Sequence, residues 1–159
     1  MSYPEARYLG DGGEVSAVLR PADQAPELTT RTGTSSYLAT GASTHGLFGL
    51  YRWDMAGPPT GPPPHFHRSI SESFFVLSGT VRLYDGARWI DATPGDYLYV
   101  PEGGVHGFRN ESGEPASMLI LFAPGAPREA YFEGLAAGID QLSDEERAEF
   151  YLRHDNHWL

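Results

Sequence analysis

The sequence predicts an all-β barrel or sandwich followed by a short helical C-terminal extension. Short apolar and aromatic segments recur from residue 37 onward, and strong turn signals separate them. The chain of 159 residues is rich in turn formers, with 19 Gly and 13 Pro, and 13% of it is aromatic. We expect one domain with three parts: an N-terminal arm or edge strand (1–36), a barrel (37–123), and C-terminal helices with a tail packed on the barrel (124–159).

The expected strands are short, and each ends at a turn signal such as Asp85-Gly86, which favours a hairpin. Their ranges in the barrel are 35–39, 46–54, 74–77, 81–84, 89–92, 97–100, 106–110 and 116–122. Residues 15–19 are expected to add a short strand in the arm. Two helices are expected after the barrel, at 129–137 and 144–153. The second is preceded by Ser143, which together with Glu146 fits a capping box.

Composition excludes several classes of function. Cysteine is absent, which rules out disulfides, thiolate metal sites and cysteine nucleophiles. The net charge is −10, and all 11 basic residues are arginine, so we expect no nucleic-acid partner. No apolar run approaches the ~20 residues that span a bilayer. The N-terminus lacks the pattern of a signal peptide, so we expect a cytoplasmic protein without a membrane partner.

Three histidines and one glutamate have the spacing of a metal site. His65 and His67 are two residues apart, so on a strand both imidazoles can lie on one face. Glu72 lies at an odd offset from His67, and a bend or bulge between them would return its carboxylate to that face. His106 begins a later strand. We therefore predict a site formed by His65, His67, Glu72 and His106 for one divalent transition metal.

This ligand set leaves the identity of the metal open. Imidazole and carboxylate ligands suit iron, nickel, manganese, cobalt, copper or zinc. Four protein ligands leave one or two positions on a five- or six-coordinate ion, where substrate, water or dioxygen can bind.

The same residues form two motifs that resemble those of the cupin superfamily. The first comprises His65-Phe66-His67, Glu72 and Gly79, and the second Gly95, Pro101, Gly103, His106 and Asn110. One position departs from the pattern, because the family's glycine six residues before the first histidine falls at Pro59, with Gly57 and Gly61 nearby. The resemblance implies a double-stranded β-helix, or jelly-roll barrel, with a metal inside one mouth. Residues 61–65 and 74–79 are similar to single-domain cupins of the quercetinase-like type.

The resemblance implies three classes of function. The first is a metal-dependent dioxygenase that acts on a small enolic or phenolic aromatic, with Glu72 as both ligand and catalytic base. The second is a non-oxidative metal enzyme, such as a polyketide cyclase or an isomerase. The third is a small-molecule-binding protein without turnover.

Residues beyond the ligand set are assigned from strand parity. Phe74 and Phe108 share faces with Glu72 and His106, so we expect both in a substrate pocket. Asn110 either belongs to this pocket or caps the turn that follows it. The tail with His157 and Trp158 could cover the barrel mouth. We also expect a homodimer, in which the strand at 35–39 can pair at a sheet edge.

Overall fold

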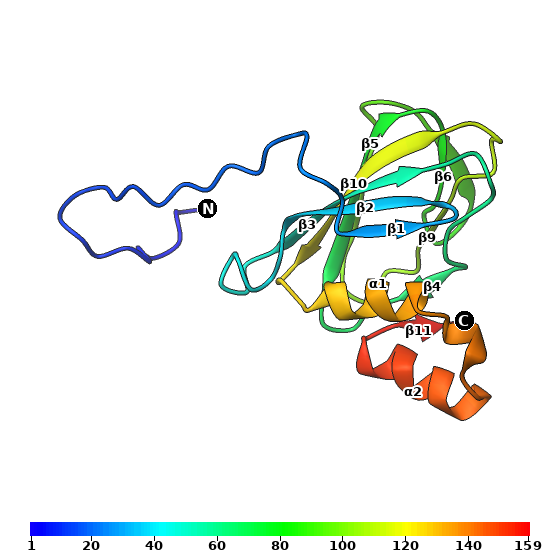
Figure 1. Cartoon of the computed structure of the whole chain (residues 1–159). Helices are drawn as coiled ribbons and strands as arrows, with labels where there is room; N and C mark the ends of the chain where they lie inside the picture. The colour runs from blue at the N-terminus through cyan, green and yellow to red at the C-terminus, as the bar shows by residue number, and fades with distance from the viewer.

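Two antiparallel sheets form the barrel, and the computed structural model describes all residues from 1 to 159 (Figure 1). The larger sheet has six strands in the order β1-β2-β3-β10-β5-β8. Their bounds are Leu28–Thr30 (β1), Gly33–Ala39 (β2), Gly49–Met55 (β3), Ala116–Ala123 (β10), Ser71–Ser78 (β5) and Tyr97–Val100 (β8). The smaller sheet has the order β7-β6-β9, with bounds Trp89–Ala92, Val81–Tyr84 and Gly107–Arg109.

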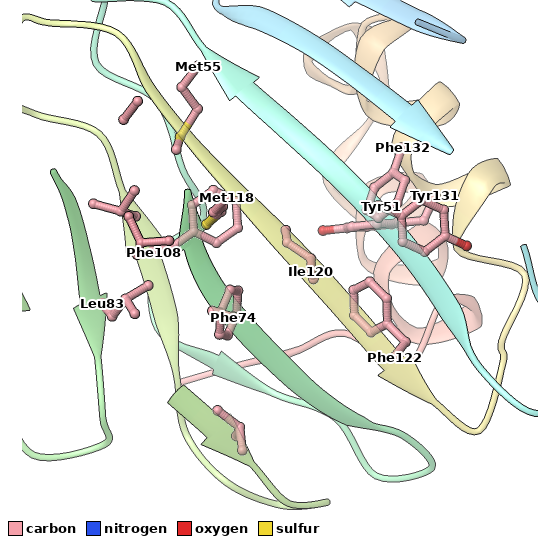
Figure 2. Packing of buried hydrophobic residues seen from close by; sticks show 14 of the residues in the cluster. Tyr51, Met55, Phe74, Leu83, Phe108, Met118, Ile120, Phe122, Tyr131 and Phe132 are labelled. Atoms are coloured by element: carbon pink, nitrogen blue, oxygen red, sulfur yellow. The ribbon is translucent and has the colours of Figure 1, made fainter. Parts of the chain in front are cut away.

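Alternation of side chains along β10 builds the core between the sheets. Met118, Ile120 and Phe122 point inward and are almost fully buried. The register places Met118 opposite Val76 and Ile120 opposite Phe74 on β5. Figure 2 shows these side chains packed with residues from both sheets. The same register puts Glu72 opposite Phe122, so the apolar stripe of β5 leads directly to a carboxylate.

The C-terminal segment folds back under the barrel, as Figure 1 shows. Helix α1 (Arg128–Ala136) buries Tyr131 and Phe132, and the Phe132 ring meets that of Tyr51 edge-on at 5.1 Å. A short 3₁₀ turn (Ile139–Gln141) leads to α2 (Asp144–Arg153). The capping box at Ser143 and Glu146 is confirmed, because each side chain accepts a bond from the other residue's backbone N–H.

The chain ends in a two-stranded ribbon close to the first metal motif. Strand β11 (His157–Trp158) pairs with β4 (His65–Phe66), which brings Trp158 opposite His65. None of the helices combines the length and the hydropathy required to cross a membrane.

Strands 81–84, 89–92 and 97–100 are confirmed at both ends. The strand expected at 74–77 is longer, because β5 already begins at Ser71, and two further predictions require correction. Residues 15–19 form no strand, because Val15 and Leu19 are exposed and no neighbouring strand offers their backbone a partner. Strand β3 begins at Gly49 rather than at residue 46. Turns occupy the preceding residues, where His45 and Gly46 both have positive φ.

The edge expected at residues 35–39 is partly covered. Strand β1 pairs with Gly33–Ser35 of β2. Further along, a carboxylate oxygen of Glu27 accepts a hydrogen bond from the Tyr37 N–H at 2.8 Å. These contacts occupy backbone groups that an added strand would need, so β2 is a poor template for pairing with another chain.

Candidate metal centre

The four residues singled out by their spacing converge at one end of the barrel. One ligand atom from each of His65, His67, Glu72 and His106 lies within 4.8 Å of the others, and all four side chains are buried. The odd offset between His67 and Glu72 is resolved by a bend at Arg68 and Ser69, as expected. The bend ends β4 and lets β5 begin with the carboxylate facing the imidazoles.

Backbone pairing holds the two motifs together. His65 and His106 exchange both backbone hydrogen bonds, at 2.9 and 2.8 Å, although they come from different motifs. The Gly103 N–H donates to the His67 carbonyl at 2.7 Å. Gly103 has φ +80°, a left-handed conformation that side-chain-bearing residues rarely adopt, which accounts for a glycine at this motif position. The positions of all three histidines are therefore fixed through the main chain.

Backbone carbonyls also determine which ring nitrogen of each histidine carries the proton. The Nδ1 atoms of His65, His67 and His106 lie 2.9, 2.6 and 2.9 Å from backbone carbonyl oxygens. A carbonyl oxygen can only accept, so each Nδ1 carries the ring proton of the neutral imidazole. Each Nε2 is then left with its lone pair free to bind a cation, an arrangement typical of metal-ligating histidines.

The charges of the site require a cation or additional protons. The Nε2 atoms of His67 and His106 lie 3.1 and 2.8 Å from the same oxygen of Glu72, Oε2. Burial would raise the pKa of Glu72, but the facing imidazoles of His106 and His67 hold that pKa well below its usual range. Burial would lower the pKa of His106, and the Glu72 carboxylate raises it overall. Burial, together with the neighbouring His106, lowers the pKa of His65 to about 4.

These observations fit a divalent metal ion. Lone pairs on three Nε2 atoms would repel the carboxylate unless positive charge lay among them. Imidazolium protons or a metal cation can supply that charge, and the two compete, so metal binding releases protons. The donor set, one carboxylate and three imidazoles without sulfur, suits the transition metals expected from the sequence.

The C-terminal segment takes part in the site. The Asp155 carbonyl is the acceptor for His67 Nδ1. The Asp155 carboxylate accepts hydrogen bonds from the backbone N–H groups of Arg68 and Ser69, at 3.0 and 2.8 Å, and from the Ser69 hydroxyl at 2.6 Å. Beyond it, the Trp158 ring lies 5.1 Å from that of His65. The tail thus lies where the sequence suggested a cover for the barrel mouth.

A cavity of about 600 Å³ opens beside the ligands and includes His65 and Glu72 in its wall. Seven aromatic residues contribute to the rest of the wall: Trp53, Phe108, Phe122, Tyr131, Phe132, Tyr151 and Trp158. This volume and lining are typical of a site for a small organic molecule.

The three residues assigned to the pocket by parity lie in different surroundings. Phe108 lines the cavity. Phe74 is fully buried in the core, with its ring 5.9 Å from that of His106, and does not reach the cavity wall. Asn110 is also fully buried and lies outside the cavity lining. Its amide donates to the carbonyls of Ala56 and Glu114, and its oxygen accepts from Ser112, so it closes the turn after β9.

The departure at Pro59 does not disturb the loop before His65. Thr60 pairs with Asn110 through two backbone hydrogen bonds of 3.2 and 2.9 Å. At Gly61 the loop backbone passes close to the backbone of β9, since a Cβ there would lie 2.0 Å from the Phe108 carbonyl oxygen. A glycine two residues later than in the family pattern therefore meets the steric need.

Sequence reasoning missed Arg128, whose buried side chain lines the cavity, and the contacts of Asp155. Neither residue stands in a motif, and the periodicity of the last 30 residues indicates only helices.

Comparison with known proteins agrees with this geometry. Residues 53–122, which contain all four ligands, match the family described as Cupin domain. The chain carries a cupin domain. The polyketide cyclase RemF from Streptomyces resistomycificus has a similar structure, with a TM-score of 0.51 and 26% identity over 58% of this chain and 66% of that one. The resemblance and the jelly-roll fold predicted from the sequence are thus confirmed.

Two curated relatives match shorter parts of the cupin domain. Quercetin 2,3-dioxygenase from Bacillus subtilis is 33% identical over 61 residues, which are 38% of this chain and 18% of that protein. An uncharacterized protein from Aquifex aeolicus is 35% identical over 65 residues, or 41% of this chain and 53% of that protein. The matches therefore cover about half or less of each relative.

Proposed function

We propose that this protein is a metal-dependent dioxygenase of the quercetinase-like cupin type, acting on a small enolic or phenolic aromatic. The proposal rests on one observation: a buried group of three histidines and one glutamate borders a cavity lined in part by aromatic residues. Likeness to Quercetin 2,3-dioxygenase over 61 residues supports the same class of reaction.

The residues divide into those that hold a metal and those that hold a substrate. His65, His67, Glu72 and His106 would hold the ion. A bound divalent transition metal supplies Lewis acidity, and a redox-active one also permits reaction with dioxygen. Among the aromatic residues of the wall, Trp53, Phe108 and Phe132 can pack against an aromatic substrate and exclude water.

Glu72 has the position required of a proton acceptor. It is ionised at neutral pH, because the neighbouring imidazoles hold its pKa low despite burial. Both imidazole contacts use Oε2, which leaves Oε1 available to a hydroxyl group in the cavity. The carboxylate can thus take the proton of an enol or phenol, provided that the two oxygens come within hydrogen-bonding distance.

Oxygen uptake tests the proposal. Protein loaded separately with iron(II), nickel(II), cobalt(II) or manganese(II), with occupancy confirmed, is mixed with quercetin and with simpler enolic aromatics. We expect uptake that needs both metal and substrate. It should be lost in His106→Ala along with most metal affinity, and it should be retained in His45→Ala, a matched change at an exposed histidine. Fully loaded protein that consumes no oxygen with any of these compounds would refute the dioxygenase.

Glu72→Gln separates ligation from proton transfer. If Glu72 is the base, the variant can keep the metal, and turnover should fall by about 100-fold or more. Glu102→Gln, at an exposed loop position, is the control. A loaded Glu72→Gln protein with unchanged turnover would end the proton-transfer role.

Likeness to the polyketide cyclase RemF favours a second candidate, a metal-dependent cyclase without dioxygen. The same Lewis acid and the same base would then enolise a carbonyl compound for ring closure. Product formation under strictly anaerobic conditions distinguishes this reaction from the first. A loaded protein that binds aromatics but transforms none of them would be a binding protein.

A further inference from the structure

Arg128 is a buried cation beside the metal site. It is the first residue of α1, and its side chain is only 4% exposed. It lines the same cavity as His65 and Glu72. The guanidinium lies 4.2 Å from the ring centroid of Tyr131 and 4.9 Å from that of Phe122, so it is surrounded by aromatic wall rather than by water.

No carboxylate pairs with this guanidinium. One Nη donates to the His154 carbonyl at 2.7 Å and the other to the Asn156 side-chain oxygen at 3.1 Å, and both acceptors are neutral. The Nε atom is buried and has no partner. A guanidinium has five N–H donors, so three remain unused. A buried charge without an opposite charge is costly, and an anion in the cavity would remove that cost.

The net charge of the cavity also favours an anionic ligand. With a divalent ion bound to Glu72 and three neutral imidazoles, the metal group carries one net positive charge. Arg128 adds a second. Arg31 and Asp140 at the exposed rim cancel each other. With the ion bound, the charged groups that line the cavity thus sum to two positive charges.

We infer that Arg128 binds the anionic group of the substrate, which makes the substrate a small aromatic acid or aromatic enolate. The inference rests on the proposed function only in placing the substrate in this cavity. The unused N–H groups of Arg128 would donate to a carboxylate or enolate oxygen, while the ring packs against the aromatic wall. Charge-assisted bonds of this kind are among the stronger ones available to a ligand.

The test compares 2-naphthoate with 2-naphthamide, which have nearly the same shape and differ in charge. Isothermal titration calorimetry is done on zinc-loaded protein with confirmed occupancy, since zinc is not redox-active and supports no oxygen chemistry. The wild type should prefer the anion. Arg128→Gln should weaken naphthoate binding by about 10- to 100-fold and change naphthamide binding less than about twofold. Arg88→Gln, at an exposed position outside the cavity, is the control and should change neither.

Asn156→Asp tests charge without removing the arginine. It places a carboxylate on Arg128 in nearly the same volume, and the Tyr131 hydroxyl, which now accepts from the Asn156 amide at 3.0 Å, can donate instead. The tail contacts should persist while the cation is neutralised. We expect selective loss of naphthoate affinity.

Wild-type naphthoate affinity in both variants would overturn the inference. A second result would also overturn it: Arg128→Gln weakens naphthoate and naphthamide binding equally, and Asn156→Asp changes neither affinity. Arg128 would then only hold the tail in place. Since zinc-loaded protein consumes no oxygen, these results stand apart from the uptake assay, and either proposal can fail alone.

Discussion

Replacing Asp155 with alanine removes the acceptor of three hydrogen bonds from the bend that joins His67 to Glu72. The donors are the Arg68 and Ser69 N–H groups and the Ser69 hydroxyl, at 3.0, 2.8 and 2.6 Å. These bonds lie near the surface, where water can replace them in part, so each contributes about 1 kcal/mol. We expect the free energy of unfolding to fall by about 3 kcal/mol.

The same substitution should weaken metal binding. The Asp155 carbonyl, which accepts from His67 Nδ1, stays in the chain, but the carboxylate that holds it against the bend is lost. Loss of such an outer partner costs about 10- to 100-fold in metal affinity. Competition titration with a chromogenic chelator measures the affinity, and urea denaturation measures the stability.

Two control variants isolate the cause. Asp155 has φ +55°, which asparagine tolerates better than alanine, so Asp155→Asn removes the charge without adding backbone strain. It should fall between the wild type and Asp155→Ala. Asp23→Ala alters an exposed aspartate in the arm and should match the wild type. Wild-type metal affinity in Asp155→Ala would refute the claim that the tail orients His67.

Three other features give further predictions. Burial would raise the pKa of Glu27, but bonds from the Tyr37 N–H and the Arg20 side chain lower it below 4.5. The resulting stability is present above about pH 4.5 and is lost as pH falls through the lowered pKa. Glu27→Gln should thus cost about 1 kcal/mol at pH 7 and progressively less as pH falls below 4.5 in chemical denaturation; a pH-independent cost would contradict this. Metal at 100 times its Kd should raise the unfolding free energy by about 2.7 kcal/mol, measured against chelator-treated protein, and equal stability of the two forms would count against a folded-state site. Phe75 and Tyr97 are exposed cross-strand partners on the outer face of β5 and β8, so light scattering should show about twice the 17.4 kDa chain mass; a monomer would argue against the homodimer.

Local patterns in the sequence were sufficient for much of the barrel. Strands β6 and β7 form a hairpin and lie where turn signals and apolar runs placed them, because a hairpin's ends are set by residues within the hairpin. Strand β8, which pairs with β5, also has the predicted bounds. The grouping of His65, His67, Glu72 and His106 followed from strand parity, one bend and the motif resemblance. Spacing within each motif holds the information needed for these residues.

Contacts between distant segments could not be read in this way. Arg128 meets the His154 carbonyl 26 residues later, and His67 meets the Asp155 carbonyl 88 residues later. Residue type does not reveal such partners, since both acceptors are backbone atoms. Phe74 and Phe108 show a related limit: strand parity predicted that both face inward, but only the shape of the barrel decides which one borders the cavity and which one fills the core.

The pairing of β11 with β4 matters for how the protein is handled in the laboratory. Leu159 directly follows Trp158, which lies against the ring of His65. An oligohistidine affinity tag added there would start at the cavity mouth and bring foreign imidazoles close to the ion. The N-terminal arm runs away from the barrel, as Figure 1 shows, so a tag without histidines fused at that end would add no metal ligands near the cavity.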